Sequence, residues 1–157
     1  EGPALAGAGF VVAAGLQAAL LAFGGRTAGR RGRKPALLLG LGIGAASLVL
    51  LAFAANAAWF LIAMAVAGIS GAFLGPSPTA IVGDVAMGHH GGSVVAGFQM
   101  MSDFGSIVGP LVGGLLLDSA GFHLAFAAGV AVSLLALGLA ARMPETLPAQ
   151  EGPRAAT

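Results

Sequence analysis

The chain has 157 residues, of which 57% are hydrophobic and only 8% are charged. Soluble domains carry roughly 25% charged residues, so this composition excludes a soluble globular domain and indicates a membrane protein. The net charge of +1 carries no information about partners, and the absence of cysteine excludes disulfides, thiolate metal sites and cysteine nucleophiles.

Long apolar segments follow one another along the chain, and each is close to the roughly 20 residues that a helix needs to cross a bilayer. The segments are continuous rather than alternating, which argues against a barrel and predicts helices, because a helix pairs its backbone amides within the segment. The predicted spans are residues 3–24, 36–55, 58–82, 93–117 and 121–142. The predicted fold class is all-α, a polytopic integral membrane protein with a transmembrane bundle at 1–142 and a polar cytoplasmic tail at 143–157.

Positive charge is concentrated between the first two spans, where the residues from Gly25 to Pro35 hold five of the seven Lys and Arg. Cytoplasmic loops carry an excess of positive residues, so the short loop predicted at 26–34 should be cytoplasmic. The alternation of helices then puts residue 1 and the turns near 56 and 119 outside, with the loop at 84–92 inside. The expected location is a cell membrane, and more narrowly a prokaryotic inner membrane.

The basic segment reads Gly25-x-x-x-Gly29-Arg30-x-Gly32-Arg33-Lys34. It resembles the signature loop of the major facilitator superfamily, Gly-x-x-x-Asp-Arg-x-Gly-Arg-Arg/Lys. The resemblance implies a cytoplasmic gating loop in which glycines allow a tight turn and basic side chains pair with helix ends or carboxylates as two halves of a transporter rock. Gly29 stands where the family has Asp, so the loop lacks its own acidic partner. The gating residues carried over are Gly25, Arg30, Gly32, Arg33 and Lys34.

A second resemblance to the family lies in the fourth span, in the pattern Gly-x-x-x-Gly-Pro-x-x-Gly-Gly found in its antiporters. Small residues four apart let helix backbones approach closely, and the proline adds a kink that neighbouring helices tolerate. The pattern therefore predicts a helix-packing motif. Its residues are Gly105, Gly109, Pro110, Gly113 and Gly114.

The resemblance covers residues 3–148 and indicates part of a six-helix bundle. An odd number of helices, no initiator Met and a helix that starts almost at the first residue all suggest a fragment. The family's fourth helix usually carries an embedded Arg, and residues 61–68 have none. Together with Gly29, this favours helices eight to twelve, the C-terminal half. Helices two to six remain the alternative, because the two halves are repeats with the same topology.

Asp103 is the only charged residue well inside a predicted span. A central Asp costs roughly 2.5–3.5 kcal/mol on insertion scales, so we expect it to face protein or a water-filled cavity. Gln99, Ser102 and Ser106 share its helical face at spacings of three and four. This polar stripe predicts substrate binding or proton coupling; the alternative is a carboxylate that only hydrogen-bonds between helices. Gln17 is the other deep polar candidate.

The third span carries Gly68, Gly71 and Gly75, whose spacing predicts a close-packing face. Pro76 and Pro78 predict a bend in its inner half. Broken helices line transporter cavities, although a bend without any transport role fits equally well.

These patterns predict a secondary active transporter that moves a small solute by alternating access, with proton-coupled efflux of amphipathic compounds as the expected activity. The expected partners are a small-molecule substrate, protons, membrane lipids and the missing half of the transporter, with no nucleic acid. No cofactor is expected, and no metal, because adjacent histidines such as His89 and His90 seldom converge on one ion even with Asp84 nearby. The open alternatives are a membrane-embedded enzyme, which should show His and carboxylates at one membrane depth, and a non-transporting scaffold, which would not need Asp103.

The topology can be tested with single cysteines in the full-length protein. Thr27→Cys should be labelled by an impermeant reagent only from the cytoplasmic side, and Ser119→Cys only from the outside, because the basic cluster holds its end of the bundle inside. Labelling of both cysteines from the outside would contradict the predicted orientation.

Overall fold

The computed structural model describes residues 2–86 and 91–144, and these residues form helices without strands. The helices are α1 (Gly2–Arg31), α2 (Arg33–Ala52), α3 (Ala57–Leu74), α4 (Pro76–Ala86), α5 (Gly91–Ala120) and α6 (Phe122–Arg142). Five segments are long and apolar enough to cross a membrane, because α3 and α4 together make one span, Ala57–Ala86. The predicted all-α polytopic membrane fold is confirmed. His89, His90 and most of the predicted tail lie outside the described residues.

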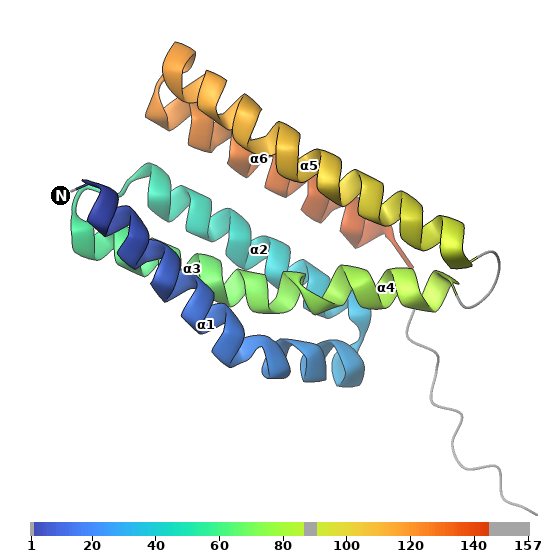
Figure 1. Cartoon of the computed structure of the whole chain (residues 1–157). Helices are drawn as coiled ribbons and strands as arrows, with labels where there is room; N and C mark the ends of the chain where they lie inside the picture. Colours follow the sequence, from blue (N-terminus) through green and yellow to red (C-terminus); the bar gives the residue numbers. More distant parts are fainter. Residues whose placement is uncertain (1, 87–90, 145–157) are drawn as a thin grey trace, which may run out of the picture.

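The helices are arranged around α2 and α3 (Figure 1). The most extensive contacts join α3 to α1 and to α2, and α6 packs against the other side of α2. Among the described helices, α5 packs only against α4 and α6, and none of its residues is buried. One surface of the chain is therefore closed by helix packing, whereas the surface that carries α5 is open.

The basic segment is helical, so the short loop predicted at 26–34 is wrong. Helix α1 continues through Arg31 and α2 begins at Arg33, which leaves Gly32 as the single break between them. Arginine is a good helix former, so the positive charge does not end the helix. Gly32 has a φ of 112°, a conformation that other residues rarely adopt, and this one residue makes the turn.

The turn predicted near residue 119, before the last helix, is also very short. Helix α5 continues to Ala120 and α6 starts at Phe122, so only Gly121 separates them, with a φ of 82°. A glycine at positive φ again reverses the chain without a longer loop.

Two predicted breaks are confirmed, and each has a local cause. Asn56 caps α3, because its side-chain oxygen accepts a hydrogen bond of 2.8 Å from the backbone N–H of Trp59. The indole N–H of Trp59 donates to the carbonyl of Leu50 at 3.2 Å and so ties the turn to α2. Helix α3 ends at Leu74 and α4 begins at Pro76, since a proline ring cannot continue an uninterrupted helix without a kink.

Glycines bring α1 and α3 into backbone contact. A Cβ added to Gly24 of α1 would overlap the carbonyl of Ala72, and one added to Gly68 of α3 would overlap the backbone of Ala13. Gly71 lies against the side-chain amide of Gln17. The close-packing face predicted on the third span is therefore confirmed at Gly68 and Gly71, and its partner is α1.

The adjacent glycines of α1 provide a matched test of this packing. Gly24→Ala should destabilise the purified chain in detergent by about 1–3 kcal/mol, because the methyl group meets the backbone of α3 and the helices must move apart. Gly25→Ala should leave stability unchanged or raise it, since nothing lies within 4 Å of that position and Ala favours a helix over Gly by roughly 1 kcal/mol. Thermal melting followed by circular dichroism measures both. Equal effects at the two positions would contradict the assigned contact.

Candidate functional site

The basic end of the bundle, where α1 ends and α2 begins, holds an ion pair between α2 and α4. The Nε of Arg33 donates to Oδ2 of Asp84 at 2.9 Å, and its Nη2 donates to Oδ1 at 3.1 Å. The two side chains are 22% and 12% exposed, so water has limited access to the pair. A bidentate hydrogen bond from a guanidinium to a carboxylate is among the stronger charge-assisted interactions. It fixes the relative orientation of the two groups as well as their distance.

This ion pair supplies the acidic partner that the basic segment itself lacks. Gly29 stands at the position where the family has a carboxylate. Asp84 of α4, which lies 51 residues after Arg33 in the chain, provides a carboxylate to Arg33 instead. From the sequence, Asp84 was a candidate only as a metal ligand, and its pairing with Arg33 was not predicted. One signal was present in the sequence: Asp84 is the only carboxylate between residues 2 and 102, and the predicted topology puts it on the same side as the basic cluster.

The other residues that the resemblance predicts for gating do not share one environment. Gly25 has open space beside its Cα, and Arg30 is exposed on the last turn of α1. Gly32 is buried, and Lys34 is half-buried next to Arg33. Arg33 forms the ion pair that joins α2 to α4, and Gly32 provides the turn.

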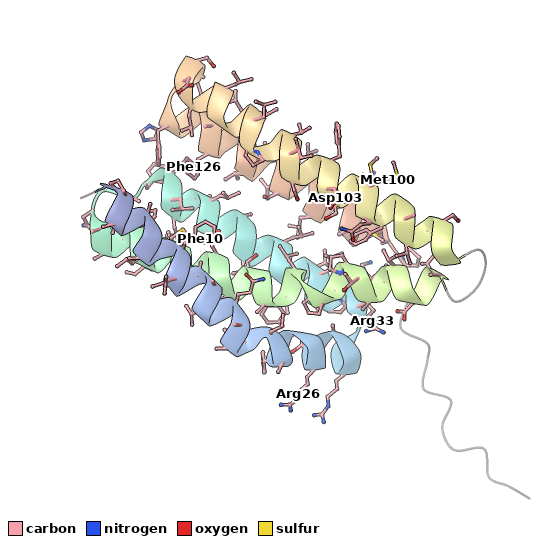
Figure 2. The ribbon with its side chains drawn as sticks, in the orientation of Figure 1. Phe10, Arg26, Arg33, Met100, Asp103 and Phe126 are labelled. Carbon is pink, nitrogen blue, oxygen red and sulfur yellow. The ribbon has the colours of Figure 1, made fainter. Side chains whose placement is uncertain are left out.

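The polar stripe lies on α5, away from the basic end and on the open side of the chain (Figure 2). The Nε2 of Gln99 donates to Oδ1 of Asp103 at 3.0 Å, so these two side chains meet as predicted. The hydroxyl of Ser106 donates to the carbonyl of Ser102 at 2.9 Å, which satisfies the helix backbone and makes no bond to Asp103. All four residues are exposed.

Apolar side chains border the stripe. Met100 and Ile107 lie three residues before and four residues after Asp103, on the same side of the helix, and both are exposed. Within the described chain, no residue buries the Asp103 carboxylate. An Asp at this depth of a spanning helix cannot face hydrocarbon cheaply, so this surface needs water or protein from outside the described residues.

Gln17 is not part of this stripe. It lies on α1, where its amide packs against Gly71, and the described residues show no contact between α1 and α5. The two deep polar candidates therefore belong to different helix surfaces.

The predicted packing motif of α5 follows the stripe along the helix. Pro110 lies inside α5, and the helix continues for ten residues beyond it. A Cβ added to Gly105, Gly109, Gly113 or Gly114 would meet nothing within 4 Å. Among the described residues, the motif therefore forms a surface that no neighbour packs against.

Metal binding has no support within the part of the chain that the structure describes, where no three His, Cys, Asp or Glu side chains come together. Asp84 faces Arg33 instead. The two neighbouring histidines predicted to stay free of metal lie in the 87–90 segment, beyond the described residues.

Comparison with known proteins identifies the family. Residues 2–157 match the family model described as Major Facilitator Superfamily. The relatives include the Multidrug resistance protein MdtH of Yersinia pestis (strain Pestoides F) and of Yersinia pseudotuberculosis serotype O:1b (strain IP 31758), each 34% identical over 124 residues.

That similarity covers 78% of this chain but only 30% of either relative, so the chain spans less than a third of those proteins. No solved structure matches the chain. The family resemblance drawn from the basic segment and the glycine motif is confirmed by the match over nearly the whole chain. The chain belongs to the major facilitator superfamily.

Proposed function

We propose that this chain is part of a secondary active transporter of the cell membrane that moves a small solute by alternating access, as a proton-coupled efflux system for amphipathic compounds. The observation that carries the proposal is Asp103, a carboxylate in the middle of a spanning helix on the open side of the chain. The Multidrug resistance protein relatives support efflux of this kind.

The open α5 surface is proposed as one wall of the central cavity, and the missing half of the transporter supplies the opposite wall. Transporters of this type place their substrate site near the bilayer midplane between two bundles. The proposed division is a transmembrane bundle at residues 1–142 and a cytoplasmic tail at 143–157. Gly29 and the absence of Arg from residues 61–68 favour helices eight to twelve, with helices two to six as the alternative.

The proposed substrate class follows from the chemistry around Asp103. A single carboxylate attracts a cation, and the exposed Met100, Phe104 and Ile107 offer apolar and aromatic contact on the same helix. Methionine is flexible and polarisable, and it is common on surfaces that bind many different partners. Such a wall suits hydrophobic cations better than sugars or anions.

Replacement of the carboxylate tests proton coupling. Asp103→Asn keeps the shape and most of the hydrogen bonding with Gln99 but removes the titrating group. In the full-length protein, we expect normal expression with at least roughly tenfold loss of proton-driven export of a lipophilic cation, measured in vesicles over a range of pH.

Asp118→Asn is the matched control, because Asp118 is the other carboxylate of α5 and lies two residues before its end. This variant should export normally. Unchanged export and unchanged pH dependence in Asp103→Asn would assign Asp103 to packing and remove the coupling role.

The ion pair at the basic end is proposed to hold α2 and α4 together while the bundle moves. Alternating access is largely a rigid-body motion of one bundle against the other, so a contact inside one bundle should contribute to stability in every state.

Removal of either partner should therefore lower stability. Arg33→Gln and Asp84→Asn should each cost about 1.5–3 kcal/mol, because each leaves the other partner partly buried without its charge-assisted bonds. Thermal melting in neutral detergent measures the loss. Arg30→Gln is the control, since Arg30 is exposed and forms no ion pair with any described residue. Equal melting of all three variants and the parent would show that the pair does not hold the bundle.

A further inference from the structure

A cavity of about 390 Å³ opens at the basic end of the bundle, between α1, α2 and α3. We propose that it binds the headgroup and upper acyl chain of one anionic phospholipid. This site is separate from the Asp103 stripe, and the proposal does not depend on which solute the protein transports. The lining residues are Phe23, Arg26, Thr27 and Arg30 of α1, Leu39 of α2 and Phe73 of α3.

Two arginines provide the anion-binding rim. Arg26 and Arg30 are four residues apart on α1, so both guanidinium groups project from the same face. Among the described residues neither forms an ion pair, whereas the charge of Arg33 is matched by Asp84. Figure 2 shows Arg26 extending from the last turns of α1 away from the rest of the bundle. Two like charges at this spacing repel, and a phosphate held by both would relieve the repulsion.

The floor of the cavity is apolar. The rings of Phe23 and Phe73 meet edge to face with centroids 6.2 Å apart. Phe73 is only 7% exposed, but Phe23 and Leu39 are 60% and 49% exposed and offer free apolar surface. Thr27 donates its hydroxyl hydrogen to the carbonyl of Phe23 at 2.9 Å, so it adds no donor for an anion. The arginines alone bind the phosphate, and the side chains below them contact hydrocarbon.

This combination favours a lipid over a free phosphate ion or a transported cation. A free phosphate would bind the two arginines of the rim but would leave the apolar floor exposed to water. A cation would be repelled by the two arginines. The packing of Gly24 against Ala72 holds the end of α1 next to Phe73, so rim and floor stay together. Basic pockets between membrane helices at the cytoplasmic surface suit anionic headgroups.

The test uses the purified full-length protein in neutral detergent. Phosphatidylglycerol should raise the melting temperature and remain bound in native mass spectrometry, whereas phosphatidylcholine and inorganic phosphate should do neither. In the Arg26→Gln/Arg30→Gln variant, the affinity for phosphatidylglycerol should fall roughly thirty-fold. The melting temperature of this variant without lipid shows that it folds, because both side chains are exposed and lack a described partner.

Arg142→Gln serves as the charge-matched control, because Arg142 is an exposed basic residue in the last turn of α6 and lies outside the cavity. This variant should bind phosphatidylglycerol as the parent does. An unchanged affinity in the double variant, an equal loss in the Arg142 variant, or equal stabilisation by inorganic phosphate would each overturn the assignment of a lipid site.

Discussion

Polar groups inside a bilayer have no water to bond with, and this constraint determines where the polar side chains of the bundle lie. The buried serines meet it in two ways. Ser70 of α3 donates to the carbonyl of Gly40 at 2.8 Å and so joins α3 to α2, whereas Ser77 donates to the carbonyl of Phe73 in the preceding turn. Among the described residues, no buried side-chain nitrogen or oxygen lacks a partner. The buried polar side chains of α1 to α4 therefore have hydrogen-bond partners within the chain.

Helix α5 by itself does not provide a full set of hydrogen bonds for its polar side chains. Asp103 receives one hydrogen bond from Gln99, although an ionised carboxylate accepts about four. No described residue packs against the glycine surface that begins at Gly105, while the equivalent small residues of α3 are packed against α1. The chain thus contains one closed interface and one surface that is complete only with water, solute or another helix bundle against it. This difference supports the proposal that α5 forms a cavity wall.

Local chemistry made most of the fold predictable from the sequence, and long-range pairing was the part that it could not supply. The apolar runs, the cap at Asn56 and the break at Pro76 follow from residues that are neighbours in the chain. The basic segment was predicted to be a loop, and this prediction was wrong because charge marks the edge of a membrane span but does not determine where the helix ends. The residue that ends the helix is Gly32. The contact of Arg33 with Asp84 depends on how α2 and α4 pack. Gly68 and Gly105 carry the same kind of small-residue pattern, and the pattern does not specify which helix will be the partner.

The basic end and the polar stripe are linked through membrane depth. The basic segment carries five Lys and Arg residues, and such side chains keep this end of the bundle at the headgroups. Asp103 lies twelve residues from the start of α5, which corresponds to about 18 Å along the helix axis. The hydrocarbon core is about 30 Å thick, so a bundle anchored at its basic end holds Asp103 near the middle of the membrane. At that depth the energy of the carboxylate is set almost entirely by what covers α5, and any step that admits water, a proton or a cation to this surface changes that energy directly.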